Sequence, residues 1–276
     1  MQTFSYVPRP PLDSLVEVIW ASRAGAFHYH GRLLPMLHHE LMINGSDRFE
    51  VRGGGQTVVA NAPAWVSGLQ TRPVEAVAAG GHFTVGVLFK PWGLRPFTRM
   101  DAAALRDQSL PPEEVFGPEA RQLVADLSPA RPAPELCRAV EAFLLRRLAG
   151  PSLPPYLSRC LARLEGSPLA DHVVNDLARQ SRVSAKTLIG HFKQYVGLTP
   201  AKYHHLVVLN RTLRHLAHHP AQTLTQTAYA LGFFDQAHLI RFFGQYTGLT
   251  PSAYLRAGRL GQVHAANPNS VELPGG

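Results

Sequence analysis

The chain has 276 residues, of which 45% are hydrophobic and 17% charged, a composition that excludes a disordered protein and leaves room for two folded domains. No run approaches the roughly 18 apolar residues of a membrane span, and the first residues lack the features of a secretion signal, so we expect a cytoplasmic protein. The two cysteines form no C-x-x-C pair and predict neither disulfides nor a zinc finger. The net charge of +8 lies in one region, since residues 157–260 hold 12 Lys or Arg against 4 Asp or Glu while residues 1–156 hold 15 against 14, which favours a polyanionic partner or a solvated basic face.

The N-terminal region is predicted to be rich in antiparallel strands. Glycine turns at 44–45, 53–55 and 80–81 punctuate its short apolar segments. The expected strands are 27–30, 39–43, 48–51, 57–60, 64–67 and 82–89. This pattern predicts a small barrel or sandwich, while residues 12–20 fit a helix or a strand.

Helical patterns follow from Pro91 onward. The expected helices are 92–99, 102–107, 118–127 and 134–148. The proline-rich segment 149–155 reads as a linker. We therefore expect a first domain over residues 1–150.

Histidines and tryptophans of this region are candidate ligand-binding residues. His28 and His30 face the same side of a strand, a spacing that suits a metal site. With them, the candidates for an effector pocket are Trp20, His28, His30, Trp65 and Trp92. Core packing is the alternative for the tryptophans. The cluster His28, His30, His38, His39 and Glu40 leaves metal binding open, but we predict no metal and no other cofactor.

The strongest internal signal is a repeat near the C-terminus. Residues 191–203 and 242–254 are identical at 8 of 13 positions, at an offset of 51 residues. In each copy an apolar helical face ends at a glycine, Gly197 or Gly248, where a left-handed C-cap is least costly. The Thr-Pro pair that follows supplies an N-cap hydroxyl and a proline at the first position of a new helix.

A short helix precedes each copy, at 173–180 and 224–231. A tight turn with a capping residue, Ser184 or Asp235, follows it. Helix, turn and helix, twice over, predict a tandem helix-turn-helix arrangement. Between the units, residues 200–217 read as one helix of about 27 Å, which suits the roughly 34 Å between successive major-groove windows.

Four segments of this region carry a family resemblance. They are Asp176-Leu-Ala178 with Val183-Ser184, Ala228-Tyr-Ala-Leu-Gly-Phe233 with Asp235-Gln236, Arg241-x-Phe243, and Gly248-x-Thr-Pro-x-x-Tyr254. In these segments the chain resembles the AraC/XylS family of transcription regulators. The resemblance implies a seven-helix DNA-binding domain whose second helices, 184–195 and 235–246, enter consecutive major grooves.

The N-terminal region resembles the effector or dimerisation domains of the same family. Leu34-Pro35 with Glu40-Leu41 and Asn44, and the stretch from Gly86 to Gly93, are similar to an uncharacterised cupin-like class. The expected fold class is α+β, with a β-rich, cupin-like barrel or sandwich followed by helices and then an all-α domain with two helix-turn-helix units.

Polar residues on the second helices are the candidate DNA contacts. Arginine pairs best with guanine and glutamine with adenine in the major groove. The predicted base contacts are Lys186, Thr187, Ile189, Gln236, His238 and Arg241. The predicted phosphate contacts are Arg182, Lys193, Lys202, Arg211, Arg214 and Gln245. Gly190 stands where the family often has a polar side chain, so the first unit is expected to read little sequence.

These observations predict a sequence-specific DNA-binding regulator and not an enzyme. Residues 1–150 would sense a small molecule or mediate dimerisation, residues 151–260 would bind DNA, and residues 261–276 would form a flexible tail. The partners expected are double-stranded DNA and a small-molecule effector, with RNA polymerase and a second copy as further candidates and no membrane. The alternatives are a metal-dependent cupin-like enzyme fused to a DNA-binding domain, and an architectural protein that binds phosphates.

Overall fold

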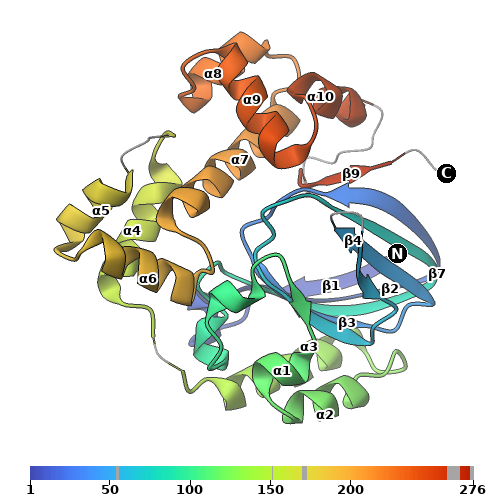
Figure 1. Cartoon of the computed structure of the whole chain (residues 1–276). Coiled ribbons are helices and arrows are strands. Elements are labelled where there is room, and N and C mark those ends of the chain that lie inside the picture. Colours follow the sequence, from blue (N-terminus) through green and yellow to red (C-terminus); the bar gives the residue numbers. More distant parts are fainter. Residues whose placement is uncertain (54–55, 151, 170–172, 260–267, 274–276) are drawn as a thin grey trace.

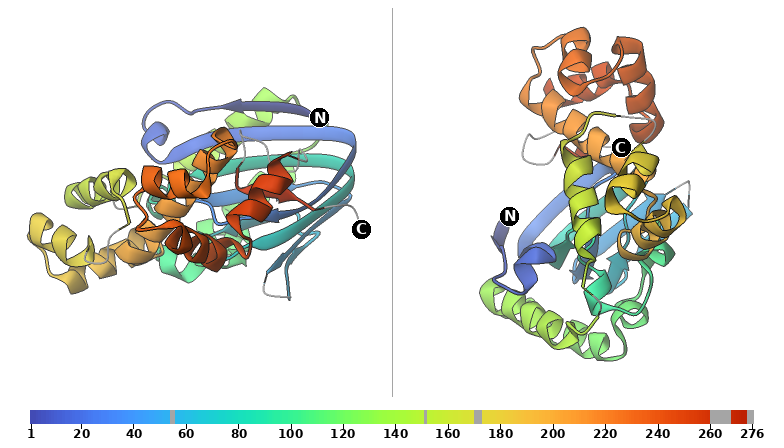
Figure 2. Two further views of the ribbon diagram at one scale, coloured as in Figure 1. Left: turned by 90° about the horizontal axis from the view of Figure 1, so that it is seen from above. Right: turned by 90° about the vertical axis from the view of Figure 1, so that its left-hand side faces the viewer.

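The computed structural model describes the chain except for residues 54–55, 151, 170–172, 260–267 and 274–276. A β-rich part with three helices lies beside a helical part, and the right-hand view in Figure 2 shows the helices of residues 224–259, in orange and red, projecting beyond the sheet at one end. The expected α+β class, β-rich first and helical after, is confirmed.

Nine strands of the described residues form one sheet. They are β1 Gln2–Tyr6, β2 Val16–Leu33, β3 His39–Asn44, β4 Arg48–Gly53, β5 Gln56–Ala60, β6 Ala64–Ser67, β7 Val74–Phe89, β8 Ser109–Leu110 and β9 Ser270–Glu272. The order β1-β2-β7-β3-β6-β8 runs across the sheet, with β4 and β5 branching from β7 and β9 pairing with β2.

The long strand β7 divides the sheet. Its first half pairs with β4 and its second half with β3, while β2 pairs with it along both halves. Gly80 lies at the division with a positive φ of 90°, and a Cβ there would collide with Asp47. Asp47 also accepts a hydrogen bond from the amide nitrogen of Gly81 at 2.6 Å. Glycine at this position therefore lets the β4–β5 hairpin separate from β3.

Among the described residues, three α-helices and three 3₁₀ turns complete the N-terminal part. They are η1 Leu12–Ser14, η2 Arg95–Phe97, η3 Ala102–Leu105, α1 Pro112–Phe116, α2 Glu119–Asp126 and α3 Ala133–Arg147. Apolar side chains of α1 to α3 and one face of the sheet form a common core, in which Phe89, Phe116 and Phe143 make successive aromatic contacts.

The described residues of the C-terminal part form seven helices, the number that the family resemblance implies. They are α4 Pro155–Gly166, α5 Val173–Ser181, α6 Ala185–Tyr195, α7 Pro200–His218, α8 Leu224–Leu231, α9 Gln236–Thr247 and α10 Pro251–Arg259 (Figure 1). The predicted helix boundaries are confirmed: Thr199 caps α7, and Gly197 and Gly248 have φ values of 89° and 67°. Buried apolar residues of these helices form a core that Leu34 and Leu69 of the β-rich part join.

Several sequence expectations were wrong at the N-terminal side. The segment 92–99, expected to be a helix, contains only the short turn η2, since Gly93 and Pro96 interrupt it. Likewise 102–107 forms only η3. Residues 16–20, left open between helix and strand, begin β2.

The expected flexible tail also needs correction. Ser270–Glu272 forms β9 and pairs with β2, and Asn269 is buried. The preceding residues 260–267 and the last three lie outside the described residues. The described end of the chain is held by the β-rich part.

Candidate DNA interface and ligand cavity

The two helix-turn-helix units are α5 with α6 and α8 with α9. The hydroxyl of Ser184 accepts a hydrogen bond from the amide nitrogen of Thr187 at 3.0 Å and so caps α6. The carboxylate of Asp235 caps α9 in the same way, at 2.6 Å from the amide nitrogen of His238. These side chains satisfy amides that would otherwise lack partners at each helix start.

Helix α9 presents polar side chains to solvent. Gln236, Arg241 and Gln245 are exposed, while His238 and Ile240 are half-buried. No hydrogen bond or ion pair within the described parts of the chain involves the Arg241 guanidinium. The Gln236 side-chain oxygen accepts a hydrogen bond from the Thr225 hydroxyl at 2.9 Å, which leaves its nitrogen free to donate. Arg241 is thus the side chain of α9 best placed to pair with an external acceptor.

Helix α6 has a plainer exposed face. Lys186, Thr187, Gly190 and Lys193 are exposed, and Ile189 is half-buried. The Thr187 hydroxyl lies 2.8 Å from the Ser184 hydroxyl and takes part in the cap. The two lysines are the charged groups that α6 offers.

The predicted phosphate contacts divide into two groups. Arg182, Lys193, Lys202 and Gln245 are exposed. Arg211 instead donates to the backbone oxygen atoms of Ser167 and Leu231, at 3.0 and 3.5 Å, and so ties α7 to its neighbours. Arg214 borders the cavity described below. Arg211 thus has partners within the protein, whereas Arg214 is exposed beside the cavity.

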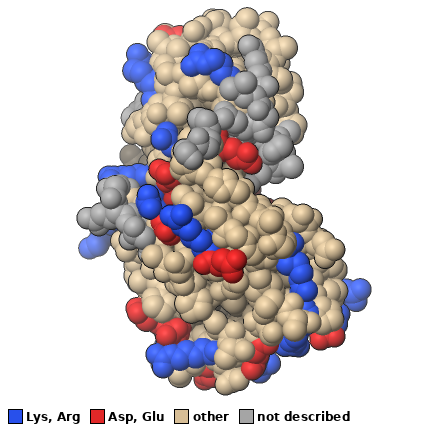
Figure 3. Space-filling view, turned by 90° about the vertical axis from the view of Figure 1, so that its right-hand side faces the viewer, with Lys and Arg blue, Asp and Glu red and all other residues tan. Residues whose placement is uncertain are grey.

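The basic excess is not spread over the whole molecule. On the face in Figure 3, basic and acidic side chains are interspersed over the β-rich part. This agrees with the near-neutral charge of residues 1–156. Electrostatic attraction for a polyanion therefore comes from the C-terminal helices.

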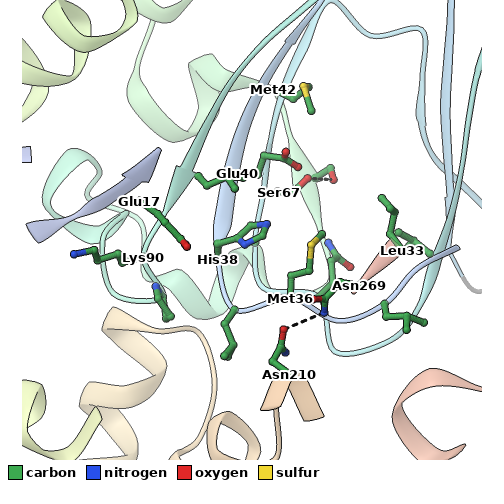
Figure 4. A pocket seen from close by; sticks show the side chains of 18 of the residues that line it. Glu17, Leu33, Met36, His38, Glu40, Met42, Ser67, Lys90, Asn210 and Asn269 are labelled. Atoms are coloured by element: carbon green, nitrogen blue, oxygen red, sulfur yellow. Dashed lines mark hydrogen bonds between the residues drawn. The ribbon is translucent and has the colours of Figure 1, made fainter. Parts of the chain in front are cut away.

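A cavity of about 940 Å³ lies between the β-rich part and the C-terminal helices. Its floor is the face of the sheet opposite α1 to α3. Tyr203, Val207 and Asn210 of α7 form part of its wall, together with Asn269 beside β9. Figure 4 shows Met36, His38 and Glu40 around the same space as Asn210 and Asn269. The cavity therefore contacts both parts of the protein.

Strand register explains which side chains form the floor. One row across the sheet pairs Trp20 with Gly86, Gly86 with Met42, and Met42 with Trp65. A Cβ at Gly86 would lie 2.5 Å from the Trp20 indole nitrogen, so glycine makes room for that ring. The Trp65 ring packs against Phe49, with ring centroids 5.1 Å apart.

The next row carries the polar groups. Leu88 pairs with Glu40, Glu40 with Ser67, and Ser67 with Ser109. Along β3, the alternation of a strand turns His39 and Leu41 into the core beneath the sheet and Glu40 and Met42 into the cavity. The Glu40 carboxyl group thereby stands on the floor beside the Ser67 and Ser109 hydroxyls, next to the row of Trp20, Met42 and Trp65.

Burial shifts the pKa values of two neighbouring ionisable groups that line the cavity, Glu40 and His38. Loss of hydration raises the pKa of Glu40 from 4.5 to about 7 and lowers the pKa of His38 from 6.5 to about 4. His38 is therefore neutral at pH 7, and Glu40 is close to half protonated.

The predicted effector residues are only partly brought together. Trp20, Trp65 and Trp92 all border the cavity. His28 is exposed, and the His30 ring nitrogen Nε2 lies 2.6 Å from the Glu75 carboxylate; neither belongs to the described lining. No grouping of three His, Cys, Asp or Glu side chains in the described residues is arranged to hold a metal. The metal-site hypothesis gains no support from this arrangement.

Glu40, Asn210 and Asn269 are among the cavity residues that sequence reasoning missed. Glu40 entered it only as a metal-ligand candidate, although a lone carboxylate within the apolar run 39–43 was a signal. Asn210 lies within the helix predicted over residues 200–217, for which the sequence indicated a spacer role only. Asn269 fell in the expected tail.

The wall and floor are joined by a buried polar contact. The Asn210 amide nitrogen donates to the Pro35 carbonyl oxygen at 3.1 Å. The Asn269 amide nitrogen donates to the same Pro35 oxygen at 2.8 Å, and also to the Asn210 side-chain oxygen at 3.0 Å. The turn after α6 touches the β-rich part too, because a Cβ at Gly197 would lie 2.8 Å from the Ala102 carbonyl oxygen.

Two family models match separate parts of the chain. Residues 177–257 match a helix-turn-helix domain, and residues 4–111 match a domain of unknown function (DUF6597). Among the described residues, no helix has the length and apolar character needed to cross a bilayer.

Curated relatives match about a third of the chain. The HTH-type transcriptional activator RhaS of Klebsiella pneumoniae is 33% identical over 103 residues, 37% of this chain and 36% of that protein. RhaS of Salmonella arizonae is 33% identical over 96 residues, 33% of this chain and 34% of that protein. The chain thus spans about a third of the length of these relatives.

Solved structures of ToxT from Vibrio cholerae are similar over most of the chain. One covers 92% of this chain and 97% of its own, with 10% identity and a TM-score of 0.48. The resemblance noted from the sequence is confirmed by the family match and the RhaS relatives. Residues 177–257 therefore carry a helix-turn-helix domain like that of the AraC-type resemblance, and residues 4–111 are similar to a domain family of unknown function.

Proposed function

We propose that the protein is a sequence-specific DNA-binding transcription regulator whose affinity for DNA changes when a small molecule binds in the cavity. The observation that carries the proposal is that one helix, α7, takes part in both the DNA-binding domain and the cavity wall. This helix joins the two helix-turn-helix units and also lines the cavity through Tyr203, Val207 and Asn210. A ligand in the cavity would therefore touch the element that sets the spacing of the recognition helices.

Helix α7 is stiff enough for this role. Its 19 residues span about 28 Å, and α6 and α9 lie near its two ends (Figure 1). A ligand that binds more tightly to one arrangement of the β-rich part and α7 shifts the population toward it. DNA affinity then changes if the two arrangements present α6 and α9 differently.

The proposed base contacts are those of the sequence analysis, with Arg241 and Gln236 foremost. RNA polymerase and a second copy of the chain are part of the proposal as partners, since the RhaS relatives are named transcriptional activators. A regulator of this kind acts in the bacterial cytoplasm, where the chromosome lies. We assign no catalytic activity.

The test is selection of bound sequences from a random duplex library, with affinity then measured at several salt concentrations. Two enriched half-sites about one helical turn apart would support the proposal. The full chain is used, because the described end of the chain pairs with β2.

An architectural protein would behave differently. It would bind every duplex with a steep dependence on salt and enrich no sequence. That outcome would overturn the regulator proposal, including its base contacts on α9.

A further inference from the structure

Glu40 is the charged group most deeply placed in the cavity. It projects from the middle of the floor between Leu88 on β7 and Ser67 on β6, and Figure 4 shows its carboxyl group turned into the open space. Protein surrounds it on all sides except the cavity. Within the described parts of the chain, no hydrogen bond or ion pair reaches its carboxyl oxygens.

The neighbours that could partner Glu40 are engaged elsewhere or uncharged. The Ser67 hydroxyl is paired with the Ser109 hydroxyl at 2.8 Å. His38 is neutral at pH 7 because burial lowers its pKa to about 4. A carboxylate in such surroundings lacks the counter-charge that buried charges normally have.

The two basic side chains of the described lining are engaged elsewhere or exposed. The Lys90 ammonium donates to the backbone oxygen of Asp13 at 2.7 Å, and in Figure 4 it lies beyond His38 and points away from Glu40. Arg214 is exposed at the edge. Glu17, also exposed and bordering the cavity, adds negative charge at the entrance. An anionic ligand would therefore meet a carboxylate inside and find basic groups only at the rim.

Aromatic rings complete the chemistry of the floor. Trp20 and Trp65 lie at the two ends of the cross-strand row next to that of Glu40. The row runs from Trp20 through Gly86 and Met42 to Trp65. The faces of indole rings attract cations, and their area packs against flat apolar groups. Carboxylate and indole rings together select a ligand with a positive charge on an apolar body.

We propose that the cavity binds an organic cation, a protonated amine or quaternary ammonium group on an aromatic body, with Glu40 as its counter-charge. The ligand body packs against Trp20, Trp65 and Met42. This inference rests on the proposed function, since it names the class of effector for the same cavity.

The experiment compares three probes that share one aromatic body. They are (1-naphthylmethyl)trimethylammonium, 2-(1-naphthyl)ethanol and 1-naphthylacetate, which are cationic, neutral and anionic. Binding to the full chain is measured by calorimetry and by quenching of tryptophan fluorescence at pH 8. We expect the cation to bind more tightly than the alcohol by about tenfold or more, and the anion to bind most weakly.

Glu40→Gln keeps the size of the side chain and removes its charge. This variant should lose the preference for the cation and bind the alcohol as the wild type does. Glu114→Gln is the matched control, because Glu114 is an exposed residue of α1 outside the cavity lining, and it should leave all three affinities unchanged. A thermal melt of each variant confirms that it is folded.

The outcomes separate the two proposals. The cation proposal is overturned if the wild type binds cation and alcohol equally, prefers the anion or binds no probe. It is also overturned if the preference for the cation survives in Glu40→Gln. Selection of DNA sequences with the same preparations reports on the proposed function independently. A protein that selects a DNA sequence but no cation remains a regulator with a different effector class.

Discussion

The Asn210 side-chain amide on α7 donates to the backbone carbonyl oxygen of Pro35, just after β2, at 3.1 Å. The same amide nitrogen lies 2.9 Å from the Leu206 carbonyl oxygen, and the Asn210 side-chain oxygen accepts from Asn269. One buried asparagine therefore connects the helix between the two DNA-binding units to the β-rich part and to the end of the chain. Buried polar contacts of this kind fix a single arrangement, because any other arrangement leaves the groups without partners.

Asn210→Ala should destabilise the protein and alter its DNA binding. The substitution leaves the Asn269 amide with one acceptor fewer, which we expect to cost about 1–3 kcal/mol of unfolding free energy. Urea unfolding measures that loss. Titration of a selected DNA site without ligand measures whether the freed α7 binds with a different affinity.

Thr212→Val is the matched control for Asn210. Thr212 is buried on the same helix, but its hydroxyl donates within the helix, to the Val208 carbonyl oxygen at 2.8 Å. We expect it to lose stability without any change in DNA affinity. If both variants have the DNA affinity of the wild type, the contact at Pro35 plays no part in regulation.

Arg241→Ala should weaken binding to a selected site by about 1–3 kcal/mol and leave binding to random duplex almost unchanged. The reason is that the exposed Arg241 guanidinium can make a bidentate contact with guanine. Affinities for both duplexes at one salt concentration check this. Lys193→Ala is the comparison, since we propose that this lysine of α6 contacts phosphate, and its removal should weaken binding to both duplexes alike. Equal losses of affinity for Arg241→Ala would remove Arg241 from the base contacts.

The C-terminal domain could be predicted from the sequence because its signals are local. Ser184 and Asp235 each cap the helix that starts at the next residue, by accepting a hydrogen bond from the amide three residues on. Gly197 and Gly248 adopt the left-handed conformation that ends a helix. Each such signal involves residues within one or two turns, so it can be recognised without knowing the fold. The repeat then showed that the pattern occurs twice.

The cavity could not be predicted in the same way because it depends on strand register. Trp20 and Trp65 are 45 residues apart in the chain and share a row only through Gly86 and Met42. Asn269 reaches Pro35 across 234 residues. Pairing of this kind is set by the whole sheet, and a shift of one residue would turn each side chain to the other face.

Gly86→Ala should push the Trp20 ring out of its place on the floor. The added Cβ would lie 2.5 Å from the indole nitrogen, so the ring must move, at a cost we expect to be about 1–3 kcal/mol. A shifted tryptophan emission and a weaker affinity for the neutral naphthyl probe would report the change. Gly25→Ala is the control, since no atom lies within 4 Å of a Cβ there, and a loss as large as that of Gly86→Ala would contradict the steric reason.

Glu40 should make the protein less stable as the pH rises. Burial raises its pKa to about 7 in the folded chain, from an ordinary value of 4.5, so the folded state holds more protons between these values and unfolding free energy falls across that range. The slope is at most about 1.4 kcal/mol per pH unit for one proton. The titratable and charged groups that border the cavity with it are Glu17, His38, Lys90, Glu165, Tyr203 and Arg214.

The comparison of wild type with Glu40→Gln isolates this effect. The lowered pKa values of His38 and His39 act with the opposite sign, since the unfolded chain takes up their protons first as the pH falls below 6.5, but they are present in both proteins and their contributions cancel in the difference. We expect the unfolding free energy of the wild type, minus that of the variant, to decrease from pH 5 to pH 8 in urea titrations. A difference that stays constant would mean that Glu40 titrates as it does in the unfolded chain, and that water or a cation already compensates its charge.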